Sequence, residues 1–193
     1  CQWENVAMAR EHMVSSFQAA AKSGNYDERP MLPADVDLQV HLSRNNRPQP
    51  FWLICEHDTV ITTLSGEGTV EFKDAPVLRH TYETGDYIYV PAGTPSRIIP
   101  KKRSVQYRYK AAEAGLEGVA WYCEKCGCQL YREVWDTADE LSQAAYFRIT
   151  RKFNDNSNQR KCRSCGKLHP KADLKGIRWD KVVNELPQHL SRS

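Results

Sequence analysis

The stretch 85-GDYIYVPAGTPS-96 decides the fold prediction for this chain. It predicts a strand, a Pro-Ala-Gly turn and the start of a second strand. In small β-barrels, a segment of this shape usually brings a metal-binding histidine to the mouth of the barrel at its last position. This chain has Ser96 there. The sequence therefore leaves three possibilities: metal ligands that have moved, catalysis without them, or a protein without catalysis.

Short runs of strand-forming residues continue on both sides of this stretch, from about Leu38 to Ala111. Turn residues such as Gly66 and Asp74 separate them at regular intervals. Several short strands with evenly spaced turns are typical of a sandwich or barrel, so we expect a mainly β fold. The expected strands cover residues 38–42, 51–57, 59–66, 68–74, 86–90, 96–100 and 104–110.

Segments of different composition flank the β region. Residues 3–24 place apolar side chains at helical spacing and end on a glycine, which predicts an N-terminal helix followed by a linker. After Gly118, two cysteine-rich motifs surround a second expected helix at residues 136–153. We therefore expect three parts: helix and linker at 1–37, a barrel at 38–118, and a cysteine-containing segment with a helix and a polar tail at 119–193.

Charge and composition argue against several classes of partner. The chain has 27 Lys and Arg against 24 Asp and Glu, a net charge of +3, and no basic run alternates with aromatic residues, which argues against nucleic-acid binding. No apolar run approaches the roughly 20 residues that a membrane helix needs, and no signal peptide is visible. The seven cysteines, an odd number, favour a metal site over a disulfide framework, and a reducing cytosol is the expected location.

Two Cys-x-x-Cys-Gly motifs are the strongest chemical signal in the sequence. We call residues 123–127 the first knuckle and residues 162–166 the second knuckle. A two-residue gap lets both thiolates of a knuckle bind one tetrahedral ion, and the glycine accepts a positive φ in the turn. Two knuckles complete one structural four-thiolate site, for either iron or zinc. Two disulfides or free thiols are the alternative. The ligands would be Cys123, Cys126, Cys162 and Cys165.

The β region also resembles the cupin fold. Its second motif is present as Gly85-x5-Pro91-x-Gly93-x2, followed by Ser96 in place of a histidine. The whole chain is similar to the 3-hydroxyanthranilate 3,4-dioxygenase family, in the form with a rubredoxin-like metal site appended at the C-terminus. The stretches that resemble this family are 45–52, 64–68, 85–95, 121–131 and 160–170.

The resemblance implies Fe(II) bound by two histidines and one glutamate, with arginines holding an aromatic substrate. Of the arginines, Arg47 matches a family position. The three ligand positions fall on Leu53 (or Phe51, depending on the anchor used), Thr59 and Ser96. Aliphatic and aromatic side chains cannot bind iron, and neutral hydroxyls are poor ligands for Fe(II). We therefore expect no metal in the barrel and no ring opening at the inherited position.

Relocated ligands remain an alternative. Cys55 and His57 have the same parity in an expected strand, so both could face the interior, with His41 or His80 as a third ligand. The competing interpretation is a buried thiol and a histidine at the rim. In a catalyst without barrel metal, Cys55, His57 and Tyr107 are the candidate proton-transfer groups.

Arginines could bind an anionic small molecule inside the barrel. Along 104-SVQYRYK-110, Arg108 shares one face with Gln106 and Lys110, and the tyrosines share the other. If Arg108 faces inward, it needs an anionic partner, and together with Arg47 and Arg97 it could hold an aromatic carboxylate. Strand parity alone leaves the opposite orientation, with Arg108 in solvent, equally open.

Three functional hypotheses follow from these observations. The first is a cupin enzyme repurposed to act on a carboxylate-bearing small molecule, aromatic or derived from an amino acid, without barrel iron. The second is a non-catalytic cupin that binds a small molecule or docks a partner. The third is a dioxygenase with relocated ligands. A homodimer is expected by resemblance, because proteins of that family often pair through the barrel.

Overall fold

The computed structural model describes residues 14–32 and 36–185 of the chain. The first part of the predicted N-terminal helix, residues 3–13, and the polar tail from residue 187 lie outside the described residues. Within the described part, helix α1 covers Ser16–Lys22 and ends before the predicted cap at Gly24.

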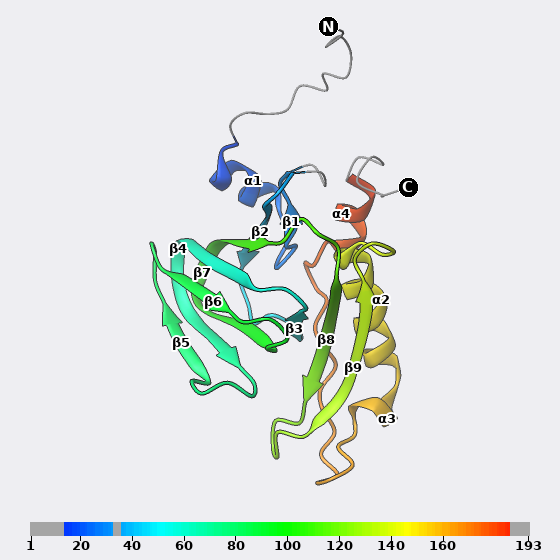
Figure 1. Cartoon of the computed structure of the whole chain (residues 1–193). Coiled ribbons are helices and arrows are strands. Elements are labelled where there is room, and N and C mark those ends of the chain that lie inside the picture. The colour runs from blue at the N-terminus through cyan, green and yellow to red at the C-terminus, as the bar shows by residue number, and fades with distance from the viewer. Residues whose placement is uncertain (1–13, 33–35, 186–193) are drawn as a thin grey trace, which may run out of the picture.

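A nine-stranded antiparallel sheet curls around the interior and forms most of the molecule (Figure 1). Strand β7 lies near its centre and pairs with β2, β3 and β4, while β4 also pairs with β5 and β6. The order β1-β2-β7-β3-β8-β9 makes up the other side. The strands are β1 Arg29–Pro30, β2 Gln39–Asn45, β3 Trp52–Cys55, β4 Thr59–Phe72, β5 Arg79–Tyr82, β6 Tyr87–Val90, β7 Ser96–Lys110, β8 Leu116–Tyr122 and β9 Gln129–Asp136.

Two long strands replace four of the predicted short ones. β4 runs through the turn expected at Gly66, and β7 joins the runs expected at 96–100 and 104–110. The pairing of β4 with β7 shifts register on both sides of Gly66, which has φ +90°. A Cβ there would lie 2.4 Å from the carbonyl oxygen of Arg103. Gly66 therefore marks a bulge that bends a continuous strand, because only glycine accepts this backbone and this approach.

Helix α2, Ser142–Asp155, packs against β8 and β9, the strands on either side of the first knuckle. The Phe153 ring stacks on Trp121 of β8, with the ring centroids 4.2 Å apart and the planes inclined by 9°. The predicted start at residue 136 is wrong, because a turn with an Asp139 N–H to Asp136 carbonyl bond precedes the helix. Two short helices that the sequence did not predict follow, α3 Ser157–Arg160 and α4 Trp179–Glu185.

The core between the curled sheet and the helices centres on Phe51. Its ring contacts Tyr26, Trp121, Tyr146 of α2 and Trp179 of α4, with centroid distances of 4.8 to 6.2 Å. Each of these five side chains is at most 2% exposed. Burying a large aromatic side chain contributes on the order of 2–3 kcal/mol, so this cluster fastens the C-terminal helices to the sheet.

The predicted mainly β fold, a curled sheet with an N-terminal helix and a cysteine-containing C-terminal segment, is confirmed. β8 crosses the boundary expected after residue 118 and pairs with β3 over four residue positions, so the sheet is continuous there. The division of the chain into three parts at residues 37 and 118 stays a prediction. Within residues 14–32 and 36–185, no helix is long and apolar enough to cross a membrane.

Candidate functional site

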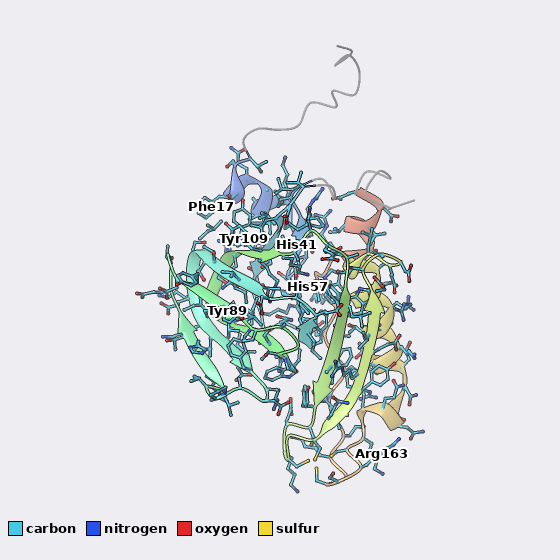
Figure 2. All side chains as sticks on the ribbon, viewed as in Figure 1. Phe17, His41, His57, Tyr89, Tyr109 and Arg163 are labelled. Carbon is cyan, nitrogen blue, oxygen red and sulfur yellow. The ribbon has the colours of Figure 1, made fainter. Side chains whose placement is uncertain are left out.

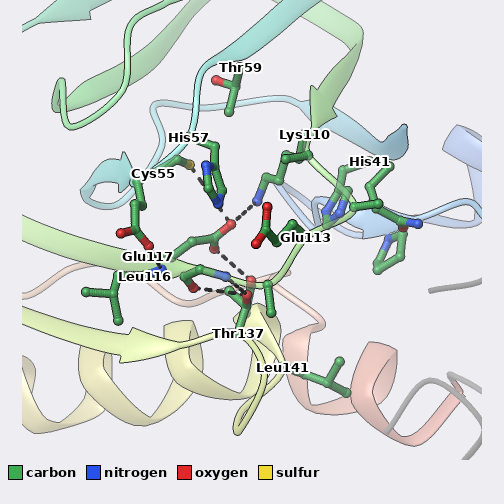
Figure 3. A pocket seen from close by; sticks show the side chains of 18 of the residues that line it. His41, Cys55, His57, Thr59, Lys110, Glu113, Leu116, Glu117, Thr137 and Leu141 are labelled. Carbon is green, nitrogen blue, oxygen red and sulfur yellow. Dashed lines mark hydrogen bonds and ion pairs between the residues drawn. The ribbon is translucent and has the colours of Figure 1, made fainter. Parts of the chain in front are cut away.

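A cavity of about 130 Å³ opens at one end of the curled sheet (Figure 3). Four strands and one strand connection bring polar side chains to its wall. They are His41 of β2, Cys55 of β3, His57 in the β3–β4 connection, Lys110 of β7 and Glu117 of β8. An engineered cavity of about 150 Å³ binds benzene, so this space suits a molecule of about one six-membered ring.

A buried ion network lies at the inner end of this cavity. The Lys110 ammonium lies 2.8 Å from a Glu28 oxygen and 2.9 Å from a Glu117 oxygen. Arg108 lies 3.6 Å from the same Glu28 oxygen, and its Nη1 donates to Thr59 Oγ1 at 3.1 Å. The four charged side chains are at most 9% exposed. Two cations thus face two carboxylates inside the sheet, and the network is neutral.

Glu28 reaches the interior from the connection between α1 and β1. Both Tyr26 and Glu28 have positive φ, 52° and 47°, a conformation that costs non-glycine residues about 1–3 kcal/mol. Contacts from distant elements hold this backbone: Trp179 Nε1 donates to the Tyr26 carbonyl at 2.9 Å, and Gln143 Nε2 donates to the Glu28 carbonyl at 2.5 Å. The Tyr26 hydroxyl also donates to the Glu28 carboxylate.

Burial and neighbouring charges shift the pKa of the groups around the cavity. Burial raises the pKa of Glu28, but the nearby Lys110 and Arg108 charges outweigh this and lower it to about 2. Burial, together with the Lys110 charge, lowers the pKa of His41 to about 3, so its ring is neutral. Burial and the Glu117 carboxylate raise the pKa of Cys55 to about 12, so the thiol stays protonated.

The residues at the positions of the family's iron ligands do not fit an iron ion. Leu53 and Ser96 are paired directly across β3 and β7, so these two positions lie next to each other, as a ligand pair requires. Both side chains are buried, at 1% exposure, and neither is a ligand for Fe(II). The Thr59 hydroxyl already accepts the hydrogen bond from Arg108. These three residues therefore supply no iron ligand at the position that the resemblance implies.

The alternative ligand set is brought to one cavity without forming a metal site. His41, Cys55 and His57 all line the cavity, although His57 lies in the β3–β4 connection and not in the strand that the sequence predicted over residues 51–57. Among the described residues, only the four knuckle cysteines form a group of three or more potential ligands within 4.8 Å of one another. His80 stands on β5, where its ring packs against Phe72.

The structure resolves the orientation of β7 that the sequence left open. Arg108, Gln106 and Lys110 face the interior, and Arg108 is 3% exposed. Tyr107 lies on the opposite face beneath α1, where its hydroxyl bonds the Ser16 hydroxyl at 2.5 Å. Tyr107 is therefore not brought together with Cys55 and His57.

Arg47 and Arg97 lie away from Arg108 and do not line this cavity. The Arg47 guanidinium binds the Asp173 carboxylate and the Lys175 carbonyl at the surface. Arg97 lines a second cavity near the first knuckle, and its Nε donates to the Gln49 carbonyl at 2.8 Å. The three arginines thus stand at three different places, and a substrate-binding role for each stays a prediction.

Glu28 and Glu117 are the site residues that the sequence analysis missed. Glu28 lies in the expected linker, and Glu117 lies just before the expected barrel end. One signal could have found them. If Arg108 and Lys110 point inward, their two positive charges need buried carboxylates that neutralise them. The sequence does not say which of the 24 acidic residues supply them.

The four knuckle cysteines converge at the far end of the β8–β9 hairpin. Sγ atoms of Cys123 and Cys165 are 3.5 Å apart, as are those of Cys126 and Cys162. Four thiolates at about 2.3 Å from a tetrahedral ion lie about 3.8 Å from one another, so the group fits one ion. Backbone amides of the first knuckle lower the pKa of Cys123 to about 6, which favours the thiolate. Cys128 lies outside the group.

Comparisons with known proteins place the chain near dioxygenases at low identity. No family model matches it. It is similar to 3-hydroxyanthranilate 3,4-dioxygenase of Bacillus cereus (strain 03BB102), 24% identical over 95 residues, which cover 47% of this chain and 50% of that protein. The chain thus spans about half the length of this curated relative.

Among solved structures, the chain is similar to hydroquinone 1,2-dioxygenase PnpCD, with 20% identity, a TM-score of 0.46, and 56% of this chain and 78% of that chain covered. It is also similar to a cupin-2 domain containing protein from Shewanella frigidimarina, with 17% identity, a TM-score of 0.36, and 42% and 78% covered. The similarity to each of these proteins is at low identity, 17 to 24%.

Proposed function

We propose that this chain binds a small, uncharged or amine-bearing molecule of about one ring in the cavity at the end of the curled sheet, without a metal in the barrel interior. One observation carries the proposal. His41 Nδ1 and His57 Nε2 are buried and have no hydrogen-bond partner in the described chain, and both residues line the cavity. A buried polar atom without a partner costs about 1–3 kcal/mol, and a polar ligand group that reaches these nitrogens would offset this cost.

Charge in the cavity narrows the class of ligand. Glu28 and Glu117 already balance Arg108 and Lys110. Glu56 and Glu113 add further carboxylates to the wall. A ligand carboxylate would have to displace Glu28 or Glu117, at the cost of separating a buried ion pair. A neutral or amine-bearing ligand avoids this cost, which supports it over the carboxylate-bearing substrate expected from the sequence.

The protonation states support binding more strongly than catalysis. The Cys55 thiol, with its pKa near 12, is a poor nucleophile at neutral pH. Neighbouring Glu117 and Glu28 hold the pKa of Lys110 above its usual value despite burial, so its ammonium does not act as a base. His57 is the remaining candidate for proton transfer, and its Nε2, which is buried and has no hydrogen-bond partner in the described chain, supports acid–base catalysis as a second candidate function.

The four-cysteine group supplies a structural metal site in this proposal. Cys123, Cys126, Cys162 and Cys165 would hold one iron or zinc ion, which would link the β8–β9 hairpin to the segment after α3. A cytosolic location, where thiolates stay reduced, and a homodimer stay predictions.

A matched set of ligands tests the proposed function. We expect calorimetry to show that aniline and 2-aminobenzamide bind, and that anthranilate, which has the size of 2-aminobenzamide but a carboxylate, binds at least tenfold more weakly. Ala114 lies in the cavity wall, so the larger side chain of Ala114→Phe should fill the cavity and abolish binding. The exposed control Ala138→Phe should bind normally. Tight anthranilate binding or an unaffected Ala114→Phe variant would contradict the proposal.

Product analysis on the same samples separates the two candidate functions. Any ligand that binds is incubated with the wild-type chain and with His57→Gln, and the mixture is analysed by chromatography. Unchanged ligand supports a binding protein. Conversion that His57→Gln loses while binding persists supports acid–base catalysis by His57.

A further inference from the structure

A second cavity, of about 320 Å³, lies between the curled sheet and the first knuckle. Its wall is built from different elements than the first cavity. Trp52 of β3, Lys73 after β4, Arg97 of β7 and Tyr122 of β8 line it, and Cys123 closes one side. No hypothesis on the barrel interior uses this space. Figure 2 shows the side chains of the hairpin region, above the labelled Arg163.

Arg97 brings an incompletely paired guanidinium to this cavity. A guanidinium has five N–H donors. In the described part of the chain, Arg97 makes one side-chain hydrogen bond, from Nε to the Gln49 carbonyl, and no ion pair within 4.0 Å. Burial lowers its pKa, while the charges of Glu71 and Glu124 oppose this shift. Guanidinium N–H groups in a half-buried position are matched best by an oxyanion.

Lys73 adds a second cation without a carboxylate partner among the residues described. Its Nζ lies 5.0 Å from the ring centroids of both Trp52 and Tyr122. These rings hold the lysine head beside the cavity by cation–π attraction. The acidic groups on the wall have other cationic partners: Glu71 pairs with Arg79, which also lines the cavity, at 3.3 Å, and Glu124 pairs with Lys167 at 3.3 Å.

We propose that this second cavity binds a small molecule through an oxyanion, a carboxylate or a phosphate group, held by Arg97 and Lys73. Two half-buried cations without carboxylates at hydrogen-bond distance, in one concave site, form an anion site rather than a structural ion network. The volume exceeds that of a lone oxyanion, so the anion has room for an attached organic group. The charge balance here is opposite to that of the first cavity, where carboxylates already neutralise the cations.

Three probes test this proposal on the metal-containing full chain. Benzoate, inorganic phosphate and the neutral benzamide are titrated into the Ala114→Phe variant, whose first cavity is filled, by calorimetry and by Trp fluorescence, because Trp52 lines the second cavity. We expect saturable binding of benzoate or of phosphate, and none of benzamide. Benzoate binding alone identifies a carboxylate ligand, and phosphate binding alone identifies a phosphate ligand. Binding of neither anion, or equal binding of benzamide, would overturn the proposal.

Variants assign the binding to this cavity. Arg97→Ala should weaken the anion at least tenfold, since a hydrogen bond to a charged group contributes about 1.5–3 kcal/mol. Arg97→Lys keeps the charge and should weaken it less, which guards against loss by misfolding. The exposed Arg103→Ala is the matched control and should bind normally. Ala114→Phe, in the first cavity, should leave anion binding unchanged. Unaltered binding by Arg97→Ala would contradict the assignment.

Discussion

The Glu28 carboxylate lies 2.8 Å from the Lys110 ammonium, and the side chains are 2% and 8% exposed. The connection after α1 thus places an acidic side chain against the face of β7 that points inward. Arg108 adds its charge to the same carboxylate oxygen. Glu28 therefore occupies the position that an anionic ligand of the interior arginine would need, which explains why the cationic face of β7 is compatible with a closed core.

Removal of this carboxylate charge should destabilise the chain strongly. In Glu28→Gln, the two buried cations keep only Glu117 as a counter-ion. Breaking a buried ion pair by changing one partner costs about 3–5 kcal/mol, and we expect a loss of this size in the free energy of unfolding measured with urea. Glu185→Gln, at a half-exposed pair with Arg29, is the control and should change much less. Equal effects of the two variants would show that Glu28 is not a buried counter-ion.

Stability should fall as the pH drops from 6.5 toward 4.5, and His41 should be the cause. Its pKa is about 3 in the folded chain and about 6.5 when unfolded, so the unfolded chain binds the extra proton in this range. Each such proton lowers the free energy of unfolding by about 1.4 kcal/mol per pH unit. His41→Leu should remove this slope. Glu28, with its pKa lowered to about 2, should add a further loss only below about pH 4.5.

Local patterns predicted the parts of the structure that depend on neighbours in sequence. The knuckle glycines have the expected positive φ, 74° at Gly127 and 73° at Gly166. Each cysteine pair is positioned by its own turn, and the two pairs meet in one group. The turn predicted at Gly66 is wrong, because a glycine inside a β region is compatible with either a turn or a bulge. In the structure Gly66 forms a bulge within β4.

Residues far apart in sequence decide what the sequence left open. Whether Arg108 faces inward depends on the carboxylate that Glu28 supplies from a segment that looks like a linker. The size of the first cavity depends on how α2 packs against the sheet, and no pattern within one strand contains that information. The role of a strand face thus follows from the long-range partner, not from the parity of the strand.

Loss of a knuckle cysteine should remove the bound metal and lower the stability of the chain. We expect one iron or zinc ion per chain by elemental analysis, and a marked loss of thermal stability in Cys162→Ser, because structural four-thiolate sites contribute directly to folding. Cys128→Ser, next to the first knuckle but outside the ligand group, should keep both metal and stability. If Cys162→Ser still retained one equivalent of metal, the ion would be bound at another site.

Loading with Fe(II) should not produce ring cleavage at the metal position that the resemblance implies. Leu53, Thr59 and Ser96 supply no iron ligand, and Thr59 is bonded to Arg108. We expect no ring-cleavage absorbance when the chain is mixed with Fe(II), dioxygen and 3-hydroxyanthranilate. Robust turnover would show that another set of side chains binds the iron, and His41→Leu and His57→Gln would then test the first cavity.

Backbone strain should make the two knuckle glycines sensitive to substitution although they have space around them. A Cβ at Gly127 or at Gly166 would meet no atom within 4 Å, so these positions do not need glycine to avoid a clash with neighbouring atoms. The positive φ remains, and it costs an alanine roughly 1–2 kcal/mol. Gly127→Ala should therefore weaken metal retention against a chelator by about five- to thirtyfold. Gly127→Asn should cost less, because asparagine adopts this conformation more readily. Equal retention by the alanine variant and the wild type would mean that the turn relaxes to a different backbone.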